Sequence, residues 1–427
     1  MNNVYLLDLW CQVPFYDAYL CQALRSEGIR CALGSISFHL EPDYFRRCGL
    51  KNDPGLCDVV ARLKLTNPKV RRVLKLLEFC GNVTGLASRF ILRKPNIIHV
   101  QYLPLIEQGI PVELGLLKLA KKRGIKLVYT VHNVLPHDSK LNLREMFSKV
   151  YGLMDALICH TRESKDRLIK EFGLEAQKIW VVPHGPLFYD CEHIGNQAAK
   201  RYLGLSTGEC IVMYQGFVRP YKGLEFLLEA WKGAHASHSN ARLVIAGTGE
   251  KTYLEVIRAK VEALDIQSSV RLDLRYITTE DLPIYYRACD IAVYPHREIT
   301  QSGALMTGIA FRKPIIATDL PGFREALQDY DSAVLVEYGD VKGLSQALAM
   351  LTANPPSPAN LDGSSAMQSY QASWTVIAQQ TRACYEAVLG KGGVAQIGAG
   401  YETRAYADDE HSEDRATSES STYSVGP

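Results

Sequence analysis

Residues 211–223 read Ile-Val-Met-Tyr-Gln-Gly-Phe-Val-Arg-Pro-Tyr-Lys-Gly. The stretch opens with a short apolar run at 211–215, which predicts a buried parallel strand. Gly216 lets the backbone that follows approach a ligand closely. Arg219 and Lys222 place two cations just beyond the strand, where open α/β sheets bind their ligands. These residues indicate a phosphate site, and a solvated basic turn that opens an amphipathic helix explains them equally well.

Similar runs recur on both sides of this stretch, with amphipathic segments such as 15–27 and 112–123 between several of them. Strands alternating with helices predict doubly wound α/β sheets. The runs that predict strands are residues 4–8, 29–34, 97–101, 126–130, 156–159 and 180–182, and then 242–246, 270–273, 291–294, 314–318 and 333–336.

The alternation pauses near residue 190 and then restarts, which predicts two α/β halves. The sequence beyond residue 390 is rich in Gly, Ser, Thr, Asp and Glu, a composition typical of disorder. A helix after the proline-rich break has an apolar stripe that must be buried. The predicted parts are an N-terminal Rossmann-like domain over 1–188, a second over 189–365, a helix over 366–390 that returns to the first domain, and a disordered tail over 391–427.

The overall composition is that of a water-soluble protein with two domains of common size in its 427 residues. Its 48 basic and 46 acidic side chains leave a net charge of +2, which by itself indicates neither a nucleic-acid nor an acidic partner. No nucleic-acid partner is expected. The eleven cysteines include no C-x-x-C pair, which favours reduced thiols over a zinc site or a disulfide framework. No apolar run reaches the roughly 18 residues of a membrane-spanning helix, and the N-terminus lacks a signal-peptide pattern. We therefore expect a cytoplasmic protein.

A second phosphate-type element follows the predicted strand 291–294. Ser302 is a suitable N-cap for a helix over 304–311, and Gly303 removes any side chain from its first turn. The unpaired amides and the positive dipole end of such a helix attract phosphate. An ordinary capped helix would carry the same residues, but two such features at the ends of two strands favour a phosphate site.

The order of the motifs resembles glycosyltransferase family four over about residues 1–390. Each motif is short, and seven in order are specific. In chain order they are T-V-H-N-V-L-P-H at 130–137, V-V-P-H-G at 181–185, G-F-V-R-P-Y-K-G at 216–223, A-G-T-G-E at 246–250, Y-x-x-A-x-D at 285–290, T-Q-S-G at 300–303 and K-P-I-I-A-T-D at 313–319.

The resemblance implies a GT-B fold, in which two doubly wound Rossmann-like domains face a central cleft. It implies a nucleotide-diphosphate-sugar donor bound by the second domain, an acceptor on the side of the first domain and retention of anomeric configuration. No metal or other cofactor is expected. The donor-binding residues that it implies are Gly216, Arg219, Lys222, Glu298, Thr300, Gln301, Ser302 and Gly303.

One departure from the family concerns two glutamates that many members carry eight residues apart. Here the second position is Thr307, and Glu298 lies within one position of the first. The second glutamate usually holds the donor ribose, so the sequence leaves that contact without a residue.

His132 follows the predicted strand 126–130, where it would face the crevice and orient the transferring sugar. We predict it as the catalytic residue, although a buried histidine that holds a loop is the commoner situation. Tyr16, His137 and His184 are weaker predictions for contacts with the sugar or the acceptor.

Residues 61–94 contain nine cations and one acid, Glu78, interleaved with leucine and valine. A basic amphipathic helix of this kind is typical of a membrane-surface binder. A solvated helix that packs its apolar face on the core fits the same pattern. Since acceptors of the resembling family are often lipid-linked, a peripheral contact with the inner face of the membrane is one prediction.

These observations predict a retaining hexosyltransferase that moves a sugar to a glycan or lipid-linked acceptor in polysaccharide or glycoconjugate biosynthesis. Metal dependence is not expected, because the D-x-D at 329–331 precedes a strand rather than following one. Two alternatives stay open. A sugar-nucleotide epimerase would need acid–base carboxylates, for which Glu298 is the one candidate, and a non-catalytic sugar-nucleotide or partner-binding module is compatible with the replaced glutamate.

Overall fold

The computed structural model describes residues 3–60, 63, 67–136, 141–188, 194–237, 240–299, 302–355 and 363–390. It contains two six-stranded sheets, both within one compact unit, Met1–Gly393. Every strand pairing in the two sheets is parallel, which confirms the predicted α/β class. The predicted tail at 391–427 lies outside the described residues.

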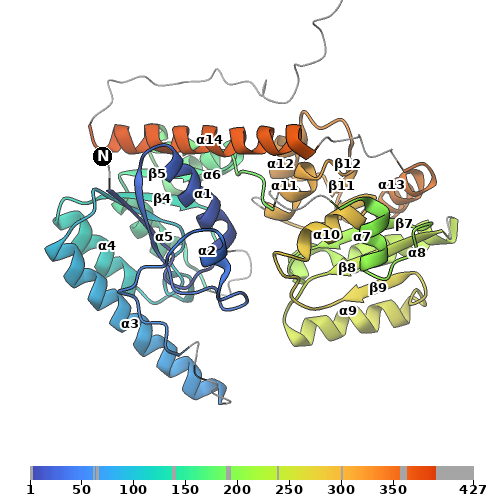
Figure 1. The fold of residues 1–427 in the computed structure, drawn as a ribbon, viewed down its shortest axis with the longest axis horizontal. Coiled ribbons are helices and arrows are strands. Elements are labelled where there is room, and N and C mark those ends of the chain that lie inside the picture. Colours follow the sequence, from blue (N-terminus) through green and yellow to red (C-terminus); the bar gives the residue numbers. More distant parts are fainter. Residues whose placement is uncertain are drawn as a thin grey trace, which may run out of the picture. The chain divides into compact units, whose positions relative to one another are not determined.

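The first sheet has the strand order β2-β1-β3-β4-β5-β6 (Figure 1). Its strands are β1 (Asn3–Leu7), β2 (Arg30–Gly34), β3 (Ile97–Val100), β4 (Lys126–Val131), β5 (Ala156–Cys159) and β6 (Ile179–Val181). The helical segments of this half are α1 (Pro14–Ser26), α2 (Tyr44–Arg47), α3 (Pro68–Leu92), η1 (Ile106–Gln108), α4 (Val112–Lys122), α5 (Arg144–Leu153), α6 (Arg162–Phe172) and η2 (Ala176–Lys178).

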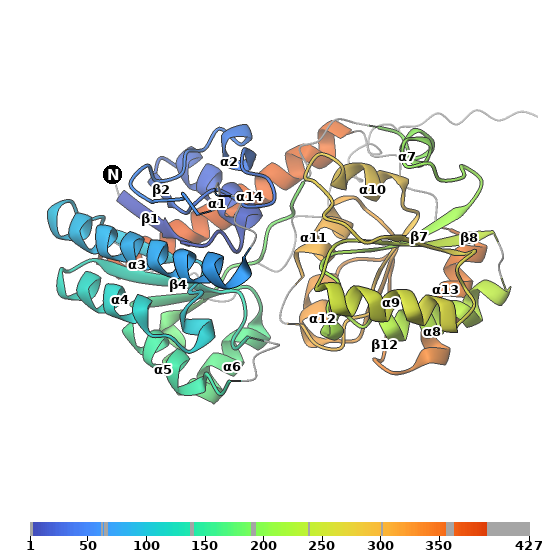
Figure 2. The same cartoon turned by 90° about the horizontal axis from the view of Figure 1, so that it is seen from below.

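Helices cover both faces of this sheet, as its uniformly buried central strands require. On one face Phe79 of α3 and Phe147 of α5 pack in one cluster with Leu127 of β4. On the other face Leu20 of α1 packs in a second cluster with Val128, the next residue of β4. Figure 2 shows α3, α4 and α5 together on the first of these faces.

The second sheet has the order β12-β11-β10-β7-β8-β9. Its strands are β7 (Cys210–Gln215), β8 (Ala241–Ala246), β9 (Val270–Asp273), β10 (Ile291–Tyr294), β11 (Ile315–Thr318) and β12 (Ala333–Val336). The helical segments are α7 (Asn196–Tyr202), η3 (Pro220–Lys222), α8 (Leu224–Ser237), α9 (Lys251–Ala263), α10 (Leu282–Ala288), α11 (Gly303–Ala310), α12 (Pro321–Leu327) and α13 (Val341–Ala353).

Each sheet contains one point at which the strand order reverses direction. In the second sheet this point lies between β7 and β10, and in the first it lies between β1 and β3. Connections leave the sheet in opposite directions there, so a crevice forms outside the carboxyl ends of the two strands, and ligands bind in it. The topology therefore draws attention to the residues that directly follow these four strands.

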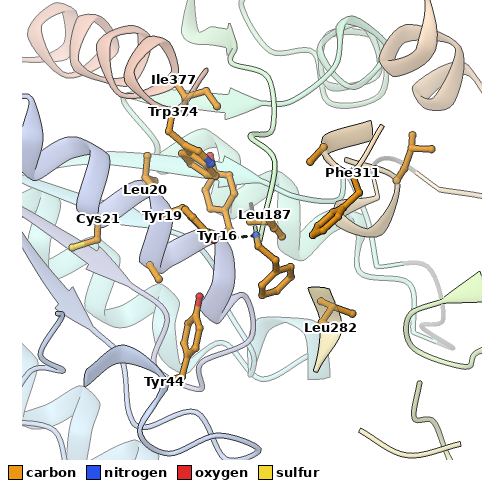
Figure 3. Close-up of a cluster of buried hydrophobic side chains, with 14 of the residues drawn as sticks. Tyr16, Tyr19, Leu20, Cys21, Tyr44, Leu187, Leu282, Phe311, Trp374 and Ile377 are labelled. Carbon is orange, nitrogen blue, oxygen red and sulfur yellow. Dashed lines mark hydrogen bonds between the residues drawn. The ribbon is translucent and has the colours of Figure 1, made fainter. Parts of the chain in front are cut away.

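The last helix, α14 (Gly363–Val388), packs on α1 and β5 of the first half. Its Trp374 lies on Tyr19 of α1 with nearly parallel rings 5.4 Å apart, as Figure 3 shows, and its indole N–H donates to Pro186 O at 2.7 Å. Tyr385 is hydrogen-bonded through its hydroxyl to His99 Nδ1 at 2.6 Å. The predicted boundary at 188/189 adjoins the undescribed residues 189–193, the one at 365/366 falls inside α14, and the division into domains stays a prediction.

Replacing Trp374 with alanine should lower the free energy of unfolding by about 3–5 kcal/mol, because the side chain is 3% exposed and leaves a large cavity. Urea denaturation measures this change. Val376→Ala, on the solvent side of the same helix with Val376 43% exposed, should change it by less than about 0.5 kcal/mol. Equal effects of the two substitutions would contradict the packing described for α14.

Candidate functional site

The loop after β7 is held against the loop after β8 by backbone contact. Gly216 has a φ of +144°, and a Cβ on Gly247 would lie 1.8 Å from the Gly216 carbonyl oxygen. Val218 N donates to Thr248 O at 2.8 Å just beyond this point. Only a glycine at 247 permits so close an approach, so the turn with Gly216 at the carboxyl end of β7 packs directly on the backbone that follows β8.

The two phosphate-type motifs lie against each other in the second half. Gly223 ends η3 with a φ of +70°, and a Cβ there would lie 1.8 Å from the carbonyl oxygen of Pro295, the residue after β10. Arg297 N donates to Tyr221 O at 2.8 Å. The turn that carries Lys222 is therefore fixed on the loop that leads to α11, at the reversal of strand order between β7 and β10.

Two cations occupy this turn. The Arg219 guanidinium lies 5.7 Å from the Phe217 ring centroid, and the Lys222 ammonium lies 5.1 Å from that of Tyr221. Burial and, to a smaller extent, the positive charge of Arg219 lower the pKa of Lys222 to about 7. No described carboxylate forms an ion pair with Lys222, so a phosphate placed here would restore its usual charge.

The start of α11 has the geometry expected of a phosphate-type helix terminus. Ser302 is 4% exposed, and its Oγ accepts a hydrogen bond from Leu305 N at 3.2 Å, as an N-cap does. Gly303 follows as the first helical residue. Thr300 and Gln301, which were also predicted to bind the donor, lie outside the described residues.

The two positions that resemble the family's glutamates have other partners. Glu298 forms an ion pair with Arg297 at 3.2 Å, and both side chains are about half exposed. Thr307 is 1% exposed, and its hydroxyl donates to Gly303 O at 2.8 Å within α11. Thr307 is therefore not free to bind a ribose, and the prediction that Glu298 binds the donor stays a prediction.

His132 directly follows β4 and is half-buried. Its Nε2 lies 3.2 Å from Oε1 of Gln101, a fully buried residue that directly follows β3. Because the amide oxygen accepts, His132 Nε2 carries a proton and Nδ1 does not. Burial lowers the pKa of His132 well below its usual value, with smaller effects from His160 and His184. The imidazole is therefore neutral, with its tautomer set by Gln101.

His132 belongs to a compact group of aromatic rings centred on Tyr16. The Tyr16 ring centroid lies 5.0 Å from that of His132, 5.2 Å from that of His160 and 5.1 Å from that of His184. Trp374 of α14 completes the group at 5.6 Å. Tyr16 is only 3% exposed and its ring contacts three imidazoles, while its predicted contact with the sugar or the acceptor stays a prediction. His137 lies outside the described residues.

Glu107 is a carboxylate that the sequence analysis did not identify. It lies in η1, beyond β3, and accepts a hydrogen bond from the Tyr102 hydroxyl. Burial raises the pKa of Glu107, while the Tyr102 hydrogen bond and the positive charge of Arg219 oppose that rise. Glu107 is thus a half-buried acid within electrostatic range of a predicted donor-binding residue.

Gln101 and His160 were also missed, although a simple positional signal was available. Gln101 directly follows β3 and His160 directly follows β5, and both strands were predicted from the sequence. Both residues lie at the carboxyl edge of the sheet, where parallel sheets bind ligands. Trp374 gave no such signal, because only the return of α14 brings it to Tyr16. Among the described residues no group of three or more histidine, cysteine or acidic side chains could hold a metal ion, and no helix is long and apolar enough to cross a membrane.

Several solved structures share this fold. Sucrose-phosphate synthase from Thermosynechococcus elongatus superposes with a TM-score of 0.68 at 17% identity, covering 92% of this chain and all of that one. Anabaena HepE in complex with UDP-glucose superposes with a TM-score of 0.65 at 12% identity, covering 91% and 99%. With its two parallel sheets, the protein has the GT-B fold of glycosyltransferases.

The sequence itself matches two family descriptions. Residues 18–185 match "Glycosyltransferase Family 4", and residues 209–354 match "Glycosyl transferases group 1". The chain belongs to this family of glycosyltransferases. A curated relative, the D-inositol 3-phosphate glycosyltransferase of Segniliparus rotundus, is 26% identical over 288 residues, or 65% of this chain and 64% of that protein. The chain thus spans less than two thirds of this relative's length.

Titration of Lys222 should make donor affinity depend on pH. A bound diphosphate raises the pKa of Lys222 above its free value of about 7, so binding takes up a proton and affinity falls as the pH rises above that value. Lys222→Arg keeps the charge and should remove the part of this fall that comes from titration of residue 222. Calorimetric titration with nucleotide sugars measures both effects.

Lys222→Ala should weaken donor binding about ten- to a hundred-fold at neutral pH, the usual contribution of a charge-assisted hydrogen bond. Lys232→Ala, on the exposed surface of α8, serves as the control and should leave affinity unchanged. Unchanged affinity in Lys222→Ala as well would show that the diphosphate binds elsewhere.

Proposed function

We propose that the protein is a retaining, metal-independent glycosyltransferase that moves a hexose from a nucleotide-diphosphate sugar to a glycan or lipid-linked acceptor. The proposal includes a role in polysaccharide or glycoconjugate biosynthesis at the cytoplasmic side of a membrane. HepE supports a UDP-sugar as the first donor to test, since it was crystallised with UDP-glucose.

The proposal rests on one observation: the turn with Lys222, the start of α11 and the imidazole of His184 lie close together. The basic turn with Lys222 is fixed on the loop after β10, and that loop leads to the capped start of α11. The imidazole of His184, which belongs to the ring group around Tyr16, lies next to Gly303 at that helix start. Groups suited to a diphosphate and groups suited to a neutral sugar are thus adjacent.

In the proposed reaction the bond between the sugar and the diphosphate breaks while the acceptor oxygen bonds to the same carbon. As the acceptor oxygen bonds to the sugar carbon, the departing diphosphate accepts the proton of that oxygen, so no additional base is needed. Arg219, Lys222 and the start of α11 stabilise the negative charge on the diphosphate, and His132 orients the sugar ring. These charges take the place of a divalent cation.

Two other functions use the same donor site. An epimerase would need a pair of acid–base carboxylates near the sugar, and Glu107 is the half-buried acid best placed for one of these roles. A non-catalytic binding module would bind the donor without turnover. Neither explains a neutral His132 with its tautomer fixed by Gln101 as directly as sugar transfer does.

The decisive experiment incubates the full chain with UDP-, GDP- and ADP-sugars, with and without glycan, lipid-linked and D-inositol 3-phosphate acceptors, in buffer containing EDTA. We expect acceptor-dependent release of nucleotide diphosphate and, by NMR, a product with the donor's anomeric configuration. Conversion of the donor without an acceptor would indicate an epimerase. Binding without turnover would indicate a binding module, and loss of activity in EDTA would contradict metal independence.

His132→Ala should lower kcat about a hundred- to a thousand-fold, because a preorganised polar group beside the reacting sugar is lost. The Kd of the nucleotide sugar should change much less, since Lys222 and α11 hold the diphosphate. His235→Gln, on α8, is the control for a histidine outside the site. Normal turnover in His132→Ala would disprove the proposed role.

The membrane part of the proposal rests on α3. Three apolar side chains of its first turns, Val70, Val73 and Leu77, are 47–61% exposed and lie on one side of the helix. Arg71 and Arg72 are exposed beside them. Figure 1 shows the start of α3 projecting beyond the other helices of this half. An apolar stripe flanked by cations is complementary to an anionic lipid surface, and it does not pack on the core.

Replacing both Val73 and Leu77 with serine should weaken binding to phosphatidylglycerol vesicles by tenfold or more. The reason is that each methylene group buried in the lipid contributes about 0.8 kcal/mol to binding. Vesicle co-sedimentation measures this. Val256→Ser, which alters an exposed valine on α9, is the matched control. Failure of the wild type to bind anionic vesicles would disprove the contact and leave the transferase proposal intact.

A further inference from the structure

His184 occupies an unusual position between the two halves of the site. It follows β6 in the segment that leads to the second sheet, and its ring lies next to the first residue of α11. A Cβ built on Gly303 would lie 3.8 Å from Cε1 and 3.9 Å from Nε2 of His184. Cδ1 of Leu187 would lie 3.4 Å from the same Cβ, so the Nε2 edge of the imidazole lies beside Leu187 at the helix start.

The other nitrogen of His184 is already committed. Nδ1 lies 2.7 Å from the carbonyl oxygen of Gly185, so it carries the proton of the neutral ring. Gly185 is itself fixed, because a Cβ there would lie 2.3 Å from the Trp374 ring. Nε2 consequently presents a lone pair, and it makes no hydrogen bond among the residues that the structure describes.

His160 provides a second, independent sign of a ligand in the same place. It is 6% exposed, its Nδ1 donates to Val182 O at 2.9 Å, and its Nε2 has no partner among the described residues. Its ring centroid lies 5.3 Å from that of His184. Buried polar atoms are almost always hydrogen-bonded, so an unpaired nitrogen here is explained by a polar group that arrives with the substrate.

We propose that His184 is a ligand of the donor's diphosphate, which it binds from Nε2 together with the amides at the start of α11, and that it takes up a proton when the donor binds. The inference rests on the proposed nucleotide-sugar donor. An imidazole can donate to an anion from Nε2 only when both nitrogens are protonated. Gly185 O is already in place to accept the Nδ1 hydrogen of that imidazolium.

The surroundings keep His184 neutral until the anion arrives. The titratable groups around it are Tyr16 of α1, His160 after β5 and His132 after β4, and none of them carries a charge. Burial lowers the pKa of His184 to about 4. A phosphate raises that pKa, so binding takes up one proton and affinity falls by up to tenfold per pH unit between the free and the bound pKa.

Lys222 also takes up a proton, but in a different pH range. Its free pKa of about 7 confines its effect to higher pH, whereas the effect of His184 begins above about pH 4. In a Lys222→Arg background the contribution of Lys222 is removed while the charge is kept. Nucleotide sugars are suitable probes, because each phosphate has one ester and one anhydride bond and therefore has no group that titrates in this range.

The test measures the Kd of UDP-glucose, GDP-mannose and ADP-glucose by calorimetry from about pH 5 to about pH 8, in two buffers of different ionisation enthalpy. The proteins are Lys222→Arg, Lys222→Arg with His184→Gln, and Lys222→Arg with His235→Gln. The glutamine amide can donate a hydrogen bond but does not titrate. We expect a Kd that rises with pH and close to one proton taken up, in the first and third proteins only.

The second protein should bind with a Kd that is nearly independent of pH. If His184 only supports the structure, His184→Gln would weaken binding equally at every pH and leave the dependence of Kd on pH unchanged. That result would overturn the inference. A pH-independent Kd in Lys222→Arg itself would overturn it as well, with the nucleotide-sugar proposal intact. If none of these sugars binds to the wild-type chain, both proposals fall.

Discussion

The contact between Gly223 and the Pro295 carbonyl oxygen holds the turn with Lys222 against the loop that follows β10. It lies where the strand order of the second sheet reverses between β7 and β10, the place at which backbone connections diverge and leave a crevice. The contact closes η3 onto the loop that leads to α11. As a result, one cation-bearing turn and one helix start approach the same volume, although the chain separates Lys222 from Gly303 by the whole of α8 to β10.

The first half supplies neutral polar groups, in contrast to the cations of the second half. The imidazoles of His132, His160 and His184 are neutral and held in one tautomer each by Gln101, Val182 and Gly185. Burial lowers the pKa of each ring, which keeps charge out of the site until a phosphate arrives. Such a site is preorganised for charge that develops during a reaction, because little rearrangement is needed when it appears.

Helix α14 joins these histidines to the rest of the fold. Trp374 packs on Tyr16 and Gly185, and Tyr385 is hydrogen-bonded to His99 in β3. A substitution in α14 would therefore alter the positions of the imidazoles as well as the stability of the fold. The same packing explains why residue 185 is a glycine, since the indole occupies the space that any side chain would need.

Much of the architecture follows from the sequence alone. Uninterrupted apolar runs such as 211–215 and 126–130 predicted parallel strands correctly, because burial on both faces leaves no alternation, and Ser302 was correctly predicted as an N-cap. The residues that follow strands can be predicted by the same reasoning. Lys222 and His132 were predicted as site residues in this way, and Gln101 and His160 could have been. Only the tertiary structure decided that Thr307 is committed to its own helix, that Trp374 covers Tyr16, and that His184 faces Gly303. These contacts join segments far apart in the chain, or depend on where a rotamer points, and neither is encoded in local periodicity.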